Sequence, residues 1–386
     1  MKKLLLTLCL AALAIQMNAD ALSTQILQNN ESLQAARLSL AGDELTLQTE
    51  GNLPDPEVEM EIMASPVSSI ELTATESLEW PGVYKMRGNA RRHRIDAMHY
   101  LYESKKMEVL KQARLAYADL VSLNNKLQRR RQLLTVVDSI LKSISKAELR
   151  QGFTVLDVSK LKIETFDIAS DISAMEIQRE VVLSDLVQMN GGKPLEGVDL
   201  NCASYQLSVM PADHYVAAYY DSPEYQAVLS GLQADAYDIK ASKQSWLPNI
   251  TFGYKFVKDG DVRGHGAVVG LSIPMFSNRG KVKASQAVQT SNDYAKSALS
   301  RKGEADIRSR YDEVVRLQQS IADYRARLNY AEVKRYLDQA LATKSITIVD
   351  YLAEYQYILN AFQKLDDMQA DLAGKYIELS KYESVE

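Results

Sequence analysis

The sequence predicts a mainly α-helical protein with a small β part, built as two similar halves that each hold a long helical hairpin and a β-hairpin. Three observations predict this fold. Leu78 aligns with Leu271 and Pro81 with Pro274, at a constant spacing of 193 residues. Two long stretches lack proline, and short stretches before each of them alternate apolar and polar side chains. Because there are only two copies, the repeat indicates a duplicated half-molecule and not a solenoid.

The repeat extends well beyond these positions. GFTVLD at 152–157 aligns with SITIVD at 345–350, and NLPDPEVE from Asn52 aligns with WLPNITFG from Trp246 after a shift of one residue. We therefore expect three parts after residue 21, which are repeat 1 (22–193), a linking equatorial segment (194–221) and repeat 2 (222–386).

Residues 1–21 have the layout of a secretory signal peptide. Two lysines precede an apolar run from Leu4 to Ile15, and Ala19 and Ala21 mark alternative cleavage positions. This run is too short to span a membrane as a helix. After its removal only Cys202 would remain, so no disulfide within the chain is expected.

The helices are expected in the two stretches without proline, because a proline costs about 3 kcal/mol inside a helix. The expected helical hairpins cover 82–190 and 278–384, with chain reversals near 150–157 and 343–350. A coiled-coil seam with 4-3 spacing supports the first hairpin; it consists of Val109, Ala113, Ala116, Leu120, Leu123, Leu127, Leu134, Val137, Leu141 and Ile144.

Four strands are expected, at 57–64, 70–80, 249–257 and 266–274, because apolar and polar side chains alternate there. Each has the length that a tilted strand needs to cross a bilayer. Alternation alone is equally compatible with a small soluble sheet that covers a helical bundle. If the strands enter a membrane, four are too few to close a barrel, so the barrel must form between subunits, and three copies would supply twelve strands.

Other functional classes find little support. The formal net charge of −5 and the scattered basic residues argue against nucleic-acid binding. The sequence contains no GxSxG, HExxH or P-loop string, so we expect neither an enzyme nor a cofactor. We also expect no metal site, because the four histidines do not cluster; they are His93, His99, His214 and His265.

The duplicated strings LEWPGVYKMRGNAR and LSIPMFSNRGKVKAS, together with RQGFTVLDVSKLKIE and KSITIVDYLAEYQY at the reversals, resemble the TolC-like family of outer-membrane efflux proteins. The LPDPEVE segment is similar to the heavy-metal efflux branch. The resemblance implies a homotrimer whose twelve-stranded β-barrel lies in outer-membrane lipid and continues into a periplasmic α-helical barrel. It also implies a passive exit duct that works with a periplasmic adaptor protein and an inner-membrane pump of the resistance-nodulation-division (RND) type.

The resemblance places the helix reversals at the periplasmic entrance of the duct. It implies that Asp350 belongs to an acidic constriction, while Asp157 is its counterpart in the first copy and could instead cap the returning helix. Two further charged positions of the family are Ala353 and Ile346 here, which departs from the usual latch. Gly152 and Ser345 are the matching residues that begin the two reversals.

The polar faces of the hairpins supply the expected lumen-lining side chains, which are Glu57, Glu59, Glu61, Glu71, Glu79 and Lys255. Two interpretations of the glutamates remain. One is that they only provide the polar wall that a water-filled channel needs, and the other is that they give the channel a preference for cations. One competing function also remains for the whole chain. A soluble periplasmic coiled-coil adaptor or scaffold could use the strands as a docking domain.

Overall fold

The computed structural model describes residues 21–64, 68–143, 155–202, 207–274, 276, 278–328, 330–343 and 345–383. The expected signal peptide, up to residue 20, and Gly152 lie outside the described residues. Residues 21–29 are helical. The elements that follow are α2 (Glu31–Thr49), β1 (Glu57–Met63), β2 (Ser69–Leu78), α3 (Pro81–Ser143), α4 (Val155–Met189), α5 (Ala212–Asp221), α6 (Pro223–Gln244), β3 (Asn249–Asp259), β4 (Val262–Ser272), α7 (Lys281–Arg327), α8 (Tyr330–Ala342), α9 (Ile348–Leu379) and the 3-10 helix η2 (Ser380–Tyr382).

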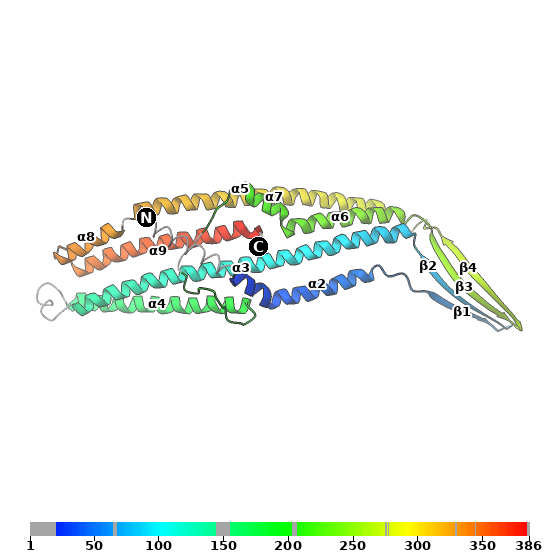
Figure 1. The fold of residues 1–386 in the computed structure, drawn as a ribbon, viewed down its shortest axis with the longest axis horizontal. Coiled ribbons are helices and arrows are strands. Elements are labelled where there is room, and N and C mark those ends of the chain that lie inside the picture. Colours follow the sequence, from blue (N-terminus) through cyan, green and yellow to red (C-terminus); the bar gives the residue numbers. More distant parts are fainter. Residues whose placement is uncertain are drawn as a thin grey trace. The chain divides into compact units, whose positions relative to one another are not determined.

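The prediction of a mainly helical fold with a small antiparallel sheet is confirmed (Figure 1). The two hairpins join into one sheet with the order β1-β2-β3-β4, because β2 pairs with β3 as well as with β1. The second turn is shorter than the expected KDGDVRG segment. The ladder continues to the pair Asp259 and Val262, and Gly260 at φ 56° permits the tight connection.

The helical stretch of the second half differs from that of the first. Helix α3 is continuous over 63 residues, as the seam predicts. The corresponding stretch of the second half comprises two helices, because α7 ends at Arg327 and α8 begins at Tyr330. The segment expected as a linker contains α5, and Ser222 then caps α6 by accepting a hydrogen bond from the Tyr225 N–H at 3.3 Å.

The chain forms two compact units, and each takes residues from both sequence halves. Unit 1 contains the residues up to Gln34, Lys106–Ala218 and Ala305–Glu386, and unit 2 contains Ala35–Lys105 and Tyr219–Glu304. Helices α3 and α7 contribute to both units. The sheet lies entirely in unit 2, while α4, α8 and α9 lie entirely in unit 1.

The core of unit 1 follows the seam predicted for α3. Leu127 and Val137 pack in one cluster with side chains of α4 and α9, including Ile168 and Tyr355. A second cluster joins the first helical residues to α3 and α4; its buried members are Leu22, Ile26, Ala113, Leu120 and Leu186. The apolar side chains that hold unit 1 together therefore come from parts of the chain far apart in sequence.

An ion pair with one buried partner links α3 to α9. The guanidinium of Arg129 makes two hydrogen bonds to the Asp366 carboxylate, one of them from Nη2 to Oδ1 at 2.9 Å. Asp366 is only 2% exposed, and Arg129 also lies 4.7 Å from the ring centroid of Phe362. A fork-like guanidinium satisfies both carboxylate oxygens at once, which is what a buried carboxylate requires.

We predict that Arg129→Ala lowers the stability of unit 1 by about 3 kcal/mol, because it leaves the Asp366 charge buried without its partner. Arg131→Ala is the matched control on the same helix. Its ion pair with Glu176 at 2.5 Å is largely exposed, so its loss should cost less than about 1 kcal/mol. The measurement is the urea dependence of the helical circular dichroism signal, and equal midpoints for the two variants would contradict the prediction.

Candidate functional site

The sheet of unit 2 has one apolar face that is exposed. Direct cross-strand partners share a face, so the registers assign Val58, Ala74, Tyr254 and Ala267 to one row and build the face row by row. Many of its large apolar members are exposed to solvent: Val58 is 68% exposed and Val269 72%. The other exposed members of this face are Met60, Ile62, Ile70, Phe252, Tyr254 and Leu271. Polar side chains interrupt this face at Glu76, opposite Phe252, and near the turn between β3 and β4, at Lys258, Arg263 and His265.

The opposite face is polar and carries the predicted lumen-lining residues of the strands. Glu59 pairs with Thr73, which in turn pairs with Lys255, so these side chains share a row. Glu61 lies directly opposite Glu71, and Lys255 forms an ion pair with Glu71. Like charges opposite one another destabilise a strand pair, and Lys255 offsets this repulsion. Five of the six predicted residues therefore gather on one face, which are Glu57, Glu59, Glu61, Glu71 and Lys255.

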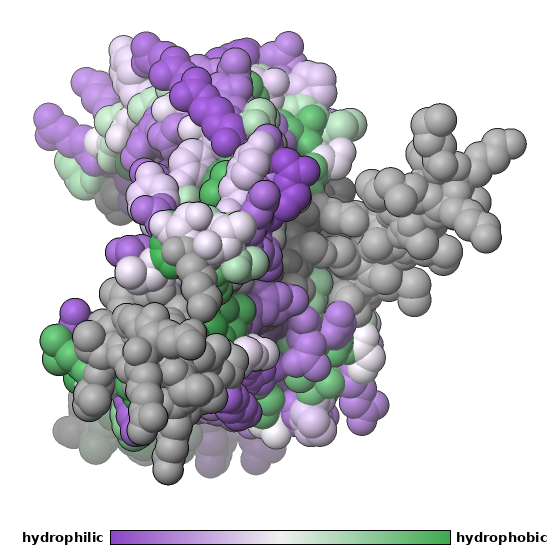
Figure 2. Space-filling view, turned by 90° about the vertical axis from the view of Figure 1, so that its left-hand side faces the viewer, coloured by the Kyte–Doolittle hydropathy of each residue, from purple (hydrophilic) through white to green (hydrophobic). Residues whose placement is uncertain are grey.

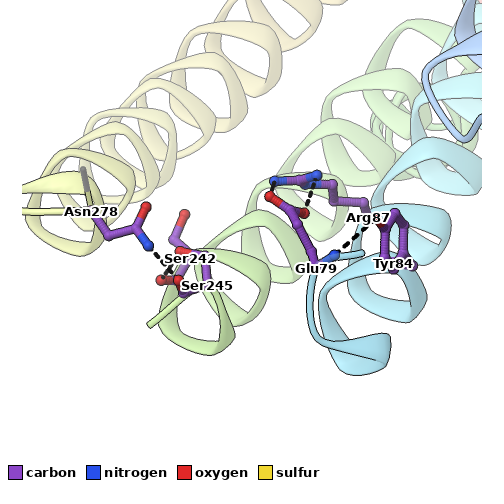
Figure 3. Close-up of polar contacts among 6 residues, drawn as sticks. All are labelled: Glu79, Tyr84, Arg87, Ser242, Ser245 and Asn278. Atoms are coloured by element: carbon purple, nitrogen blue, oxygen red, sulfur yellow. Dashed lines mark hydrogen bonds and ion pairs between the residues drawn. The ribbon is translucent and has the colours of Figure 1, made fainter. Parts of the chain in front are cut away.

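Glu79 is the sixth predicted residue, and it lies one position beyond the end of β2 (Figure 3). Its carboxylate forms an ion pair with Arg87 of α3 at 2.6 Å, and its backbone N–H donates to the Tyr84 hydroxyl at 3.1 Å. Nearby, Asn278 donates to the carbonyl of Ser245 after α6 (Figure 3). Glu79 thus stabilises the junction between β2 and α3, and it does not belong to the paired rows of the sheet that contain the other glutamates.

The two outer strands each pair on one side only. The described sheet ends at β1 on one side and at β4 on the other. An edge strand presents N–H and C=O groups that can pair with another chain, and proteins usually shorten or cover such edges. Here β4 is not shortened, because it has 11 residues, and its apolar side chains are exposed. Its outer edge could therefore pair with another strand along its length.

At the second predicted reversal, Asp350 belongs to a capping box that begins α9. The Asp350 N–H donates to the Thr347 hydroxyl oxygen at 3.1 Å, and the Thr347 N–H donates to the Asp350 carboxylate at 3.3 Å. The Asp350 side chain remains exposed. Ser345 precedes the cap, and its N–H donates to the carbonyl of Ala340 at 2.9 Å, which closes the end of α8.

The same reversal is held by a second polar contact between α8 and α9. Asp338 accepts hydrogen bonds from Lys334 at 2.6 Å and from the Tyr351 hydroxyl at 2.8 Å. Burial raises the pKa of Asp338, but the hydrogen bonds from Lys334 and Tyr351 outweigh it, so the net pKa lies below its ordinary value. The ionised Asp338 carboxylate therefore stabilises the fold at pH values above the ordinary pKa of a carboxyl group. This stabilisation is lost as the pH falls through the lowered pKa.

Helix α4 carries a stripe of exposed apolar side chains. Phe166 is 77% exposed, and the other members are Leu156, Ile163, Ile177 and Val181. Spacings of seven, three, eleven and four residues place them on one side of the helix. Exposed apolar residues also occur on α8 and α9, namely Val333, Tyr336 and Tyr357. Figure 2 faces the end of unit 1 with the α8–α9 turn and shows hydrophobic residues among mainly hydrophilic ones.

The sequence analysis missed the capping role of Asp350, although T-x-x-D before an apolar run is the signal of a capping box. The same pattern occurs in the first copy at Thr154 and Asp157. Thr154 lies outside the described residues, as does the side chain of Asp157, so the cap proposed for Asp157 stays a prediction. Gly152 likewise stays untested.

Within the described residues, no group of three or more potential ligands could hold a metal ion. Among the described helices, none combines the length and apolar character needed to span a membrane.

Comparison with solved structures identifies the fold as that of outer-membrane efflux channels. CusC, described for its folding and transmembrane channel formation, superposes with a TM-score of 0.77 at 16% identity, over 95% of this chain and 91% of that chain. The Campylobacter jejuni CmeC outer membrane channel gives 0.72 at 14% identity, over 95% and 85%. The open state of the Neisseria gonorrhoeae MtrE outer membrane channel gives 0.73 at 12% identity, over 95% and 88%.

No protein-family model matches the sequence, and no curated protein matches it closely enough to count as a relative. The comparison therefore rests on similarity in structure. At sequence identities of 16%, 14% and 12%, this similarity shows the fold. The resemblance to TolC-like proteins predicted from the repeated strings is confirmed at this level.

We predict that Gly253→Ala disrupts the joint between the two hairpins. A Cβ at this position would lie 2.5 Å from the Ala74 carbonyl oxygen and 3.2 Å from the Thr75 Cα, both backbone atoms that cannot move aside. The expected cost is about 1–3 kcal/mol, as for other overpacked sites. Gly264→Ala on the same face is the control, because its Cβ would meet nothing within 4 Å. Thermal unfolding of the sheet should separate the two variants, and equal transitions would refute the close approach.

Proposed function

We propose that three copies of this chain form an outer-membrane exit duct of a tripartite efflux system, which passively conducts substrate from a periplasmic adaptor and an inner-membrane pump to the exterior. Each copy would contribute four strands to a twelve-stranded barrel and its helices to a periplasmic helical barrel. The likeness in fold to CusC, CmeC and MtrE supports this function.

One observation carries the proposal: the sheet exposes an apolar face, keeps a polar face opposite, and leaves both edges unpaired. In lipid, each unpaired backbone group costs several kcal/mol, so an open sheet there must close. Pairing β4 of one copy with β1 of the next would satisfy both edges at once. It would also turn the apolar face to lipid and the glutamates to the lumen.

The exposed stripe of α4 supports assembly in unit 1. Phe166 and Ile163 are exposed to solvent in the single chain, and contact with a neighbouring copy would bury them. At about 25 cal/mol per Å² of apolar surface, burial of such a stripe would favour association by several kcal/mol per contact. The exposed residues Tyr336 and Tyr357 on α8 and α9 are the counterpart that we propose for this stripe.

The proposals for the pump class and for the cargo rest on the sequence alone. The LPDPEVE segment makes an RND-type heavy-metal exporter the first system to test. No resident metal site is required for that cargo, because a passive duct need not bind what passes through it. The two helix reversals are the parts that we propose to meet the adaptor.

The expected result of cell fractionation is recovery in the outer-membrane fraction, with release only by detergent. Light scattering of the solubilised protein, corrected for detergent, should give three times the mass of one chain. Reconstitution into planar bilayers should then give ohmic channels. A soluble monomer in the periplasmic fraction would instead support an adaptor or scaffold and would refute the duct.

We further predict that Asp350→Asn raises the conductance and lowers the ratio of cation to anion permeability by roughly twofold or more, because three carboxylates around one axis would attract cations and, by binding them, restrict flow. Thr347→Ala is the matched control. It removes the hydroxyl that accepts the Asp350 N–H, at a cost of about 1 kcal/mol, but keeps the charge.

Reversal potentials across a salt gradient measure both variants. If Asp350→Asn conducts and selects like the unmodified channel, Asp350 is a capping residue only. If both variants change selectivity equally, the helix cap and not the charge is responsible. The same recording tests the glutamate face, since clear anion selectivity would contradict a cation preference.

A further inference from the structure

The apolar face of the sheet ends in two facing cations at the turn between β3 and β4. Lys258 of β3 pairs directly with Arg263 of β4, so both side chains leave the same face. On its other side Lys258 pairs with Ile70, and Ile70 pairs with Ile62. The last row of the apolar face therefore reads Ile62, Ile70, Lys258, Arg263. Two exposed isoleucine side chains lie beside two exposed basic ones.

A directly opposed pair of like charges destabilises a strand pair, so its position needs an explanation. On the other face, the opposed Glu61 and Glu71 have Lys255 as a neutralising neighbour. Among the described residues, no carboxylate lies within ion-pair distance of Lys258 or Arg263. Asp259 pairs with Val262 on the opposite face, and Asp261 lies in the turn. An anion from outside the chain would supply the missing charge.

The next row of the face adds a polar group beside the cations. His265 pairs with Phe256, and the ring centroids are 5.3 Å apart. The Tyr254 hydroxyl is hydrogen-bonded to Nδ1 of His265, so Nε2 is the ring nitrogen left for a ligand. Two cations and an imidazole thus lie in adjacent rows, a donor set suited to phosphate oxygens.

The adjoining surface selects an amphiphile over a free ion. Ile62 is 63% exposed and Ile70 37% exposed, next to the cations in the same row. Basic side chains at the end of an apolar membrane face can reach headgroup level while their stems stay in the apolar layer. The glutamates of the opposite face would repel an anion there, so charge directs the ligand to this face.

We propose that Lys258 and Arg263, with His265 beside them, form a binding site for the phosphate of an anionic lipid at the turn end of the sheet. This inference rests on the proposed function, because it places the apolar face in a bilayer. The site would anchor the rim of the barrel to phosphorylated lipid headgroups. Each Lys or Arg near an anionic lipid surface strengthens binding by roughly fivefold.

The test uses the full chain in an uncharged detergent and a fluorescent phosphatidic acid as the probe. Diacylglycerol with the same acyl chains is the lipid without phosphate. We expect Lys258→Gln with Arg263→Gln to weaken phosphatidic acid binding by roughly tenfold to thirtyfold. Lys255→Gln, on the same strand but the opposite face, should leave binding unchanged. Lys258→Arg with Arg263→Lys keeps both charges and should retain binding.

Three results would overturn the proposal. One is equal binding of phosphatidic acid by the doubly substituted and unmodified proteins. Another is an equal loss in Lys255→Gln, which would indicate a general effect of charge. The third is complete displacement of the lipid by equimolar inorganic phosphate, which would indicate a free-ion site. Conductance measured on the same preparations keeps the two proposals apart, because failure of the duct abolishes channels, whereas failure of the lipid site leaves them intact.

Discussion

The backbone of β1 and β4 offers hydrogen-bonding groups along one side that no other strand of the described sheet pairs. This unmet pairing is the constraint from which the other features follow. In the proposed duct each edge would gain a partner strand, because the β4 edge of one copy would meet the β1 edge of the next. The same arrangement would also explain why large apolar side chains such as Val269 can remain exposed, at 72%, without a covering helix. A helix on that face would bury the side chains but would leave the edges as they are.

The helices of unit 1 are stabilised by contacts within the chain. The pairing of Arg129 with the buried Asp366 joins α3 to α9, and apolar clusters join α3 to α4. Only narrow stripes, such as that of α4 around Phe166, are left for contact with another copy. If the chain assembles into the proposed duct, its helical units can form before assembly, while its sheet is completed only by assembly. In that duct, the sheet is where we expect assembly and membrane insertion to be coupled.

The sequence was sufficient for features that depend on local periodicity. Alternation located the strands and assigned Val58 and Glu59 to opposite faces, and the 4-3 spacing identified Leu120 and Val137 as buried. It was insufficient where tertiary geometry decides. The tight turn at Gly260, the position of Glu79 beyond β2 and the pairing of β2 with β3 depend on cross-strand registers that no single segment encodes. The capping box of Asp350 is the exception, since its T-x-x-D signal was present but unread.

The two copies of the repeat differ in the side chains that they place on the polar face of the sheet, as the strand registers show. The polar face of the first hairpin carries several charges, with Glu59, Glu61 and Glu71, whereas that of the second carries Lys255 and glycines at 253, 264, 266 and 270. At Gly253 the neighbouring backbone of β2 leaves no room for a side chain, so close pairing of the hairpins excludes charge there. Two other cations of the second hairpin, Lys258 and Arg263, occupy the apolar face near the turn. In the proposed duct, the first hairpin would thus supply most of the charge of the polar wall, and the second would supply the cations of the rim.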